Sequence, residues 1–446
     1  MAAGPRGPGR SGAAYRASRC RLGLAPGDSH RVVWPVRHSV GRRGLDGTLQ
    51  VVSLAISRLR GFSLNARQRV FSAFFLYAFA FGGFFPRLAE LQRSMGLSEG
   101  ELGLGLIGVA CGTLFSLTFA GRLIERVGHR LTLLVLVPVL PVIFAAATHA
   151  GGTLALFLCL LPAGVCIGAV ELVVNLEADR VEHQSGQRIM NRSHAYWSFG
   201  FFGAGMLGAF AARLGVTPAW HLALMVPVSA GLVWLLLGGF EAAAQRGGLP
   251  DEPARRLAWP TPAIAGLVVF TLSGLVLEGA GIDWSAIYMR DVFGASPFMS
   301  GIAVATVACA QGLTRYVADR FVELHGPPLV ARVLVLVLGV GAGLVSVATA
   351  PAVALLGFAL LGMGTSVMFP LAMSAAAQRS DRPASTNVAA LAQIAFVSFL
   401  LAPPLLGLVA QHLGVRWAYY GVCLPLVLLS LFAVSALAPG GRPPAS

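Results

Sequence analysis

Apolar residues occur along this chain in long runs separated by short polar segments. After residue 69, twelve runs of about 20 mostly apolar residues can be marked, and such a run is long enough for a helix to cross a bilayer. Runs such as Leu131–Leu136 do not alternate apolar with polar side chains, which disfavours a transmembrane β-barrel. The pattern predicts an all-α membrane protein with twelve transmembrane helices, which begin near Val70, Leu102, Leu131, Thr153, Ala195, Ala219, Pro262, Phe298, Leu329, Ala352, Asn387 and Trp417.

The second half of the chain repeats the first at a spacing of about 198 residues. Seven positions between Val109 and Gly128 carry the same residue 198 positions later, from Val307 to Gly326. Two six-helix halves follow, at 70–240 and 262–438, with a tail at 1–69, a central cytoplasmic loop at 241–261 and a short tail at 439–446. Parallel repeats of this kind build many secondary transporters, whose substrate site lies where the halves meet.

Composition supports the membrane interpretation. The net positive charge could suggest a nucleic-acid partner, but most of it lies in one terminal segment. The chain is 56% hydrophobic and 12% charged, which is too apolar for a soluble protein of 446 residues. Residues 1–69 contain thirteen Arg and two Asp, and therefore account for +11 of the net charge of +14. This leader has the composition of a disordered tail; a start site assigned too far upstream and an organellar transit peptide are the alternatives.

The remaining charge predicts how the chain is oriented in the membrane. Loops on the N-terminal side carry thirteen Arg and loops on the other side carry five. Since cytoplasmic loops retain basic residues, both termini are predicted to be cytoplasmic, in a multi-pass protein of a bacterial inner membrane. The six Cys show no CxxC spacing, so neither a disulfide framework nor a metal site is expected.

One polar loop, between the second and third predicted helices, carries a recognisable motif. It contains Gly, acidic and basic residues at fixed spacing, namely Gly121, Arg122, Glu125, Arg126, Gly128 and Arg130. A weaker copy in the second half contains Asp319 and Arg320. The motif resembles the loop signature of the major facilitator superfamily, with Glu125 in place of the usual aspartate. This resemblance implies the major facilitator fold.

The resemblance also implies a role for this loop as a conformational latch. The Glu125 carboxylate would contact the N-terminus of the eleventh helix, near Ser385, Thr386 and Asn387. Exposed N–H groups and the helix dipole favour an anion there. The contact would hold the inner side shut while the outer side is open, and the alternative is an ordinary basic cytoplasmic loop.

Two further segments resemble the fucose permease-like branch of the superfamily. The first contains Asn175, His194 and Trp197-Ser198-Phe199-Gly200, and the second runs from Glu278 to Tyr288. This likeness implies membrane transport and, more weakly, a sugar-like substrate. Residues 394–404 lack the Gly-Tyr pair expected in this branch, and residues 70–86 contain no acidic residue, unlike its sugar symporters.

Ionisable residues inside predicted spans are the candidate site, because such groups are costly in lipid and normally face a cavity or a partner. Glu171 and Asn175 share a stripe with Gly164 and Gly168 that is expected to face a central cavity. Glu171 is a candidate proton-coupling or substrate-binding carboxylate. An ion pair at the inner end, with Arg180 or Arg188, is the alternative.

The seventh predicted helix carries a second group of candidates. Glu278 is favoured for contact with substrate or protons. Asp283 is a candidate for substrate or proton contact together with Glu278 and Trp284. The interpretation favoured for Asp283 is an extracellular latch with Arg290 or Arg87, in which Asp291 is the alternative carboxylate. Trp284 has an aromatic ring suited to stacking on a sugar face.

Three aromatic residues and one histidine remain open between a role at the cavity and plain packing. Tyr77, Phe81 and Phe84 share one face of the first helix and either border the cavity or pack against neighbouring helices. For His194, a cap or an interfacial hydrogen bond is favoured over a proton relay.

Together these features predict a secondary transporter that moves a small solute by alternating access, coupled to protons. The chain contains no Lys, so it cannot form a nucleotide-binding P-loop. Proton-coupled efflux of drugs or metabolites is the alternative within transporters, and a non-transporting membrane receptor is the alternative of another class. No enzymatic activity, cofactor or nucleic-acid partner is expected, and the protein is predicted to act as a monomer.

Overall fold

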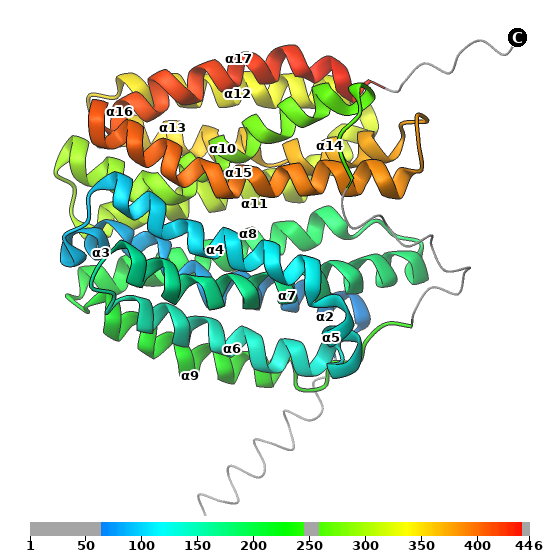
Figure 1. The fold of residues 1–446 in the computed structure, drawn as a ribbon, viewed down its shortest axis with the longest axis horizontal. Coiled ribbons are helices and arrows are strands. Elements are labelled where there is room, and N and C mark those ends of the chain that lie inside the picture. The colour runs from blue at the N-terminus through cyan, green and yellow to red at the C-terminus, as the bar shows by residue number, and fades with distance from the viewer. Residues whose placement is uncertain (1–63, 245–257, 439–446) are drawn as a thin grey trace, which may run out of the picture. The chain divides into compact units, whose positions relative to one another are not determined.

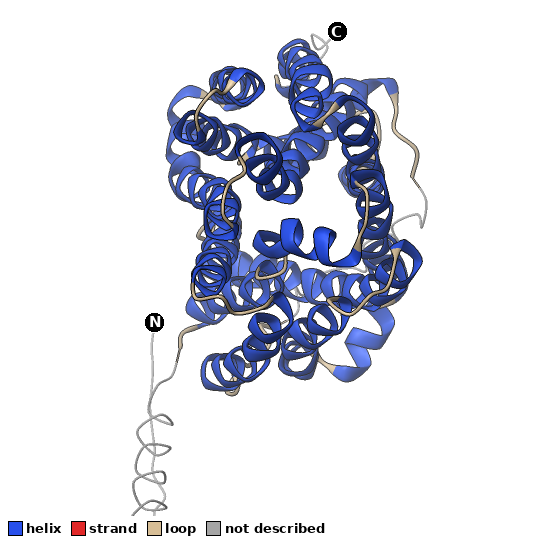
Figure 2. Ribbon diagram, turned by 90° about the vertical axis from the view of Figure 1, so that its left-hand side faces the viewer, coloured by secondary structure: helices blue, strands red, loops and turns tan. Residues whose placement is uncertain are grey.

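The computed structural model describes residues 64–244 and 258–438 of the chain. Every regular element in these ranges is a helix, and Figure 2 shows most of the helices end-on, side by side in a bundle. Residues 1–63 of the predicted tail, most of the central loop and the tail at 439–446 lie outside the described residues.

The first half begins with polar caps that fix the ends of its helices. Asn65 and Ser98 each form a capping box with the residue three positions later, which satisfies free N–H groups at the helix start. The elements of this half are α2 (Ala66–Gly82), η1 (Phe85–Arg87), α3 (Leu88–Met95), α4 (Glu99–Phe119), α5 (Gly121–Val127), α6 (His129–Ala147), α7 (Thr153–Ser185), α8 (Met190–Arg213) and α9 (Pro218–Leu237).

The second half has the same order of long helices, with two spans broken into shorter pieces. It contains η2 (Pro262–Ile264), α10 (Ala265–Phe293), α11 (Pro297–His325), α12 (Pro327–Val347), α13 (Pro351–Thr365), α14 (Met368–Ala377), α15 (Ala384–Leu413), α16 (Val415–Trp417), η3 (Ala418–Cys423), α17 (Leu424–Ala433) and η4 (Val434–Leu437). The colours of Figure 1 separate the two halves along the chain.

The predicted all-α membrane fold is confirmed, with one difference in how the spans are recognised. Eleven helices among the described residues are long and apolar enough to cross a membrane. The twelfth is α8, which begins at Met190, five residues before the predicted Ala195. Its first turns are polar, and α8 packs between α2 and α11, so Asn191, Ser193 and His194 are wholly or partly covered by protein, while Arg192 is exposed.

Glycines allow α4 and α7 to pack with their backbones close together. A Cβ at Gly112 would lie 2.0 Å from the Leu161 carbonyl oxygen, and a Cβ at Gly164 would lie 2.1 Å from the Val109 carbonyl oxygen. Small residues at such contacts are typical of membrane helices. The prediction that this stripe of α7 faces the central cavity is therefore wrong for Gly164 and Gly168, which contact α4, whereas Glu171 of the same stripe lines the cavity.

The two halves meet along two pairs of helices. The first pair is α8 with α11, and the second is α4 with α15. Figure 1 shows α4 running beside α15. The residues between these contacts line the candidate site.

Candidate functional site

A cavity of about 300 Å³ lies between the halves and is lined by residues of both. Most of its walls are aromatic or aliphatic. Its ionisable side chains are Glu171 and His194 from the first half and Glu278, Asp283 and Arg315 from the second. Charged groups inside a membrane bundle mark sites of solute or ion contact.

Glu171 reaches this cavity from α7 and does not form the ion pair considered as its alternative. Asn175, one turn later, donates to a Glu171 carboxylate oxygen through Nδ2 at 2.8 Å. The Tyr77 hydroxyl interacts with the same carboxylate. Arg180 instead pairs with Glu177, at 3.4 Å.

His194 extends this polar group onto α8. Its Nε2 atom lies 3.3 Å from Asn175 Oδ1, and its ring packs edge-on against Phe74. His194 therefore makes the interfacial hydrogen bond that its position suggested, and it also lines the cavity.

Glu278 belongs to a network that crosses between the halves. Gln311 donates to Glu278 Oε1 through Nε2 at 2.7 Å, and the guanidinium of Arg315 lies 3.5 Å from the same oxygen. Ser198, on α8 of the first half, accepts from Arg315 at 2.9 Å and donates to Gln311 at 3.2 Å. The Ser366 carbonyl accepts from Arg315 at 2.8 Å. The Glu278 carboxylate of α10 is thus bound by two side chains of α11 and, through them, linked to Ser198 of α8.

Asp283 lines the cavity, and the prediction that it forms an extracellular latch is wrong. Among the described residues it has no hydrogen bond or ion pair, and its electrostatic neighbours include the like charge of Glu278 and the hydroxyl of Tyr419. The stacking role predicted for Trp284 is also wrong. Its side chain is fully buried and contacts α15 at Gly407, because successive residues of a helix point about 100° apart.

Several residues of this site were not among the sequence candidates. Arg315, Gln311 and Ser198 sit in or beside apolar runs, and the sequence gives no indication of which helix each one faces. Among the aromatic rings at the cavity, Phe81, Trp197 and Phe201 form a cluster whose centroids lie 5.4–5.8 Å apart. Tyr77, Phe81 and Phe84 all border the cavity from α2 and the turn after it.

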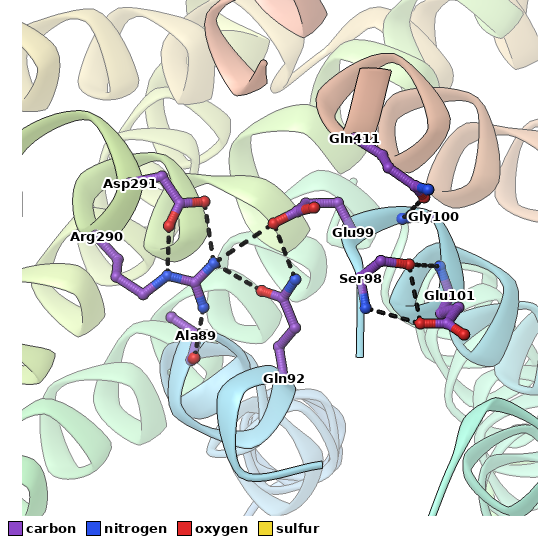
Figure 3. Close-up of polar contacts among 9 residues, drawn as sticks. All are labelled: Ala89, Gln92, Ser98, Glu99, Gly100, Glu101, Arg290, Asp291 and Gln411. Carbon is purple, nitrogen blue, oxygen red and sulfur yellow. Dashed lines mark hydrogen bonds and ion pairs between the residues drawn. The ribbon is translucent and has the colours of Figure 1, made fainter. Parts of the chain in front are cut away.

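A contact is present at the predicted outer end, but Arg290 and Asp291 form it. Figure 3 shows the Arg290 guanidinium between the halves: Nη1 donates to the Ala89 carbonyl at 2.7 Å, and Nη2 donates to Gln92 Oε1 at 2.8 Å. Asp291 accepts from Nε of Arg290 at 2.6 Å, and Glu99 lies 3.9 Å away. Arg87 is engaged elsewhere, with Glu90 and the Val216 carbonyl.

A second contact joins the same ends of the halves through α4 and α15. The side chain of Gln411 accepts from the Gly100 N–H at 3.1 Å (Figure 3). At Gly103, a Cβ would lie 2.5 Å from the Pro403 carbonyl oxygen, so the two backbones touch. The predicted outer side is therefore closed.

At the opposite end, the predicted latch of the first half is not engaged. Its loop folds as α5, which packs against α4, α6 and α7 of its own half. Glu125 and Arg126 are exposed and form no hydrogen bond or ion pair with any residue that the structure describes. The side chain of Arg122 lies outside the described residues.

The glycines and the last basic residue of this motif shape and tether the loop. Gly121 begins α5, and Gly128 ends it with a φ of 85°, a conformation that favours glycine. Arg130 donates to the Gly238 carbonyl at the end of α9.

The weaker copy of the motif does make a contact between the halves. Asn191, at the start of α8, donates to the Asp319 carboxylate near the end of α11. Arg320 beside it is exposed. The N-terminus of α15, the expected partner of Glu125, is occupied by a local group: Asn387 donates to Asp381 at 2.7 Å, and Arg382 donates to Asn387 at 2.7 Å. Hydrogen bonds from Thr261 and Asn387 lower the pKa of the Asp381 carboxyl below its ordinary value.

The described residues contain no group of three or more His, Cys, Asp or Glu side chains placed to hold a metal ion. What the cavity offers instead is three carboxylates, one guanidinium, amide groups and aromatic rings. This set can bind a small polar or charged solute, and it can carry protons.

Comparison with known proteins identifies the family. The family model described as Major Facilitator Superfamily matches residues 70–396 and 267–446. An uncharacterized MFS-type transporter of Yersinia pestis is 28% identical over 371 residues, which are 81% of this chain and 92% of that protein. An uncharacterized transporter of Sinorhizobium fredii is 28% identical over 379 residues, and the membrane protein MosC of Rhizobium meliloti is 24% identical over 353 residues.

Solved structures show the same fold at low sequence identity. The nucleoside transporter NupG superposes with a TM-score of 0.68 and 12% identity, over 84% of this chain and all of that chain. A D-xylose-proton symporter superposes with a TM-score of 0.63 and 12% identity, over 83% of this chain and 96% of that chain. With the family model matching both halves and the helices arranged as in these transporters, the chain belongs to the Major Facilitator Superfamily.

Proposed function

We propose that this chain moves a small polar solute across the membrane by alternating access, coupled to protons, through the cavity between its halves. Its family makes it a secondary transporter and a multi-pass integral membrane protein rather than an enzyme. The finer proposal concerns the mechanism, the coupling ion and the solute.

The observation that carries the proposal is the placement of ionisable side chains. Glu171, Glu278, Asp283 and Arg315 all line one cavity between two repeats. Carboxylates held within a membrane bundle can exchange protons as their surroundings change from one side of the membrane to the other. The proposed proton carriers are Glu171 and Glu278.

The contacts at the two ends fit one state of an alternating-access cycle. The predicted outer ends are joined by Arg290 and by Gln411 with Gly100. At the predicted inner end Glu125 has no partner among the described residues. We propose that Glu125 docks on the N-terminus of α15 when the outer ends separate, with Asp319 and Asn191 as the corresponding contact of the second half.

A sugar-like solute remains a proposal, as does the fucose permease-like branch. Trp197 replaces Trp284 as the ring proposed to stack on the solute, because Trp197 lines the cavity. Two transporters of the same fold are named for a nucleoside and for D-xylose with protons, which supports testing polar ring-shaped solutes first.

Proton uptake by proteoliposomes tests this proposal. The purified protein is reconstituted with a pH-sensitive dye inside, and sugars, nucleosides and small amines are added outside. We expect a solute-dependent proton flux that Glu171→Gln and Glu278→Gln abolish, and that Glu241→Gln retains because Glu241 is 83% exposed and outside the cavity. Unaltered pH-dependent transport in both cavity variants would remove these residues from the mechanism.

A measurement in whole cells decides the direction of transport. Accumulation of a labelled solute in cells that express the protein supports import, and loss of the solute supports proton-coupled efflux. Absence of flux across the whole panel, with folded protein, favours a non-transporting receptor. Fusions of reporter proteins to each end test the proposed cytoplasmic termini and the bacterial inner-membrane location, and scattering measurements in detergent test the proposed monomer.

A further inference from the structure

The charges that line the cavity do not balance. Three carboxylates, Glu171, Glu278 and Asp283, face it together with one guanidinium, that of Arg315, and with the imidazole of His194, whose hydrogen-bond partner is Asn175 rather than a carboxylate. Arg315 lies 3.5 Å from Glu278 and also acts electrostatically on Glu171. The positive charge of Arg315 therefore interacts with Glu278 and Glu171, and Asp283 has no cation beside it among the described residues.

The contacts around Asp283 show that the unpaired negative charge is located at this residue. No described residue forms a hydrogen bond or ion pair with it. Its electrostatic interactions are with the carboxylate of Glu278 and the hydroxyl of Tyr419, which donates instead to the Ala280 carbonyl. A carboxylate held away from water is unfavourable unless a cation neutralises it, and a neighbouring like charge increases that cost. The cavity is thus short of one positive charge at Asp283.

The walls indicate what kind of cation fits. Phe81, Trp197 and Phe201 form a cluster of rings that lines the same cavity, with Tyr77 beside them. The faces of aromatic rings attract organic cations, and tryptophan attracts them most strongly. A proton would neutralise Asp283 but would gain nothing from these rings, whereas an ammonium group with an organic body would use both.

We infer that the cavity selects a small organic cation, whose ammonium group pairs with Asp283 and whose body packs against the aromatic walls. The inference rests on the proposed function in taking this cavity as the solute site. It adds the chemical class of the solute, which the proposed function leaves at small and polar.

Matched pairs of probes test the charge requirement on the full-length protein in detergent. Choline is compared with 3,3-dimethyl-1-butanol, which has the same shape with carbon in place of nitrogen, and glucosamine is compared with glucose. Binding is measured by calorimetry and by the shift in thermal unfolding. In at least one pair we expect the cation to bind about tenfold more tightly or better, the size of effect that an ion pair and a cation–π contact supply.

Variants then locate the charge. Asp283→Asn keeps the shape of the side chain and removes its charge, so the preference for the cation should disappear while the affinity for the neutral probe stays within about twofold. Glu241→Gln removes the same charge outside the cavity and should keep the preference. Because the wild-type comparison needs no variant, it stands even if Asp283→Asn fails to fold.

The outcomes separate this inference from the proposed function. Equal or tighter binding of the neutral members, or no binding of either cation, overturns the organic-cation inference. Neither result bears on proton-coupled transport of a neutral solute, which the proteoliposome assay measures independently. A cation preference that persists in Asp283→Asn also overturns the assignment to Asp283.

Discussion

Arg315 and Glu278 form a buried pair in which each charge depends on the other. Their side chains are 11% and 14% exposed. Removing one member of such a pair leaves an uncompensated charge and costs about 3–5 kcal/mol, whereas removing both costs far less. We therefore expect Arg315→Gln and Glu278→Gln each to lower the midpoint of thermal unfolding in detergent, and the double variant to unfold closer to wild type.

The double variant should not recover fully, because Arg315 also donates to Ser198 and to the Ser366 carbonyl. A double-mutant cycle on the unfolding midpoints gives the coupling between the two residues. Strictly additive losses would show that the pair contributes no interaction of its own.

At the residue scale, the sequence identifies the carboxylates of the site more readily than the residues that bind them. Glu171, Glu278 and Asp283 stand out because each interrupts an apolar run, and the structure places all three at the cavity. Arg315 lies near the inner end of its run, where a basic residue is ordinary. The stacking role predicted for Trp284 is wrong because adjacent helical positions face different neighbours, and the sequence alone does not say which face of α10 meets the cavity.

At the scale of elements, the packing of α4 on α7 depends on glycines in close contact. Gly112→Ala places a methyl group 2.0 Å from the Leu161 carbonyl oxygen, which forces the helices apart. Overpacking of this kind costs about 1–3 kcal/mol, so we expect a clear fall in the unfolding midpoint and in the yield of folded protein.

The matched control for this prediction is Gly231→Ala on α9, where a Cβ meets no atom within 4 Å. That change should be neutral or stabilise the protein by about 0.4–1 kcal/mol, because alanine restricts the unfolded chain. If both variants unfold at the same temperature, the close contact of α4 and α7 does not limit stability.

The lengths of the apolar runs predict most helices well. They give the wrong start for a helix whose polar turns are shielded from lipid by other helices. The predicted starts of α7 and η2, at Thr153 and Pro262, coincide with the structure. The predicted start of α8, Ala195, lies five residues after the observed start at Met190, because the polar first turns have the composition of a loop. Packing between α2 and α11 explains why those turns can be helical inside the bundle.

At the scale of the whole molecule, the repeat predicts two halves but does not predict the state in which they are found. A transporter must adopt at least two arrangements of one sequence, so their difference in free energy is small and no local pattern encodes it. The side that is closed here depends on contacts between distant residues, such as Arg290 with Ala89 and Gln411 with Gly100.

Arg290 supplies the charged contacts that close the predicted outer side, so its removal should favour the arrangement in which that side is open. Arg290→Ala loses two hydrogen bonds to the other half, at Ala89 and Gln92. Hydrogen bonds to a charged group contribute about 1.5–3 kcal/mol each, and about 1.4 kcal/mol changes a population ratio tenfold. We expect the open arrangement to increase by about tenfold or more.

Distances between spin labels measure this shift. Labels at Arg93→Cys and His412→Cys, which replace exposed residues near the outer ends of the two halves, report their separation in a background whose six cysteines are replaced. Arg290→Ala should add a population at longer distance, while Arg332→Ala, which removes an equal charge from an exposed site at the opposite end, should not. An unchanged distance distribution in Arg290→Ala would mean that the backbone contact of α4 with α15 at Gly103 holds the outer side closed without help from the guanidinium.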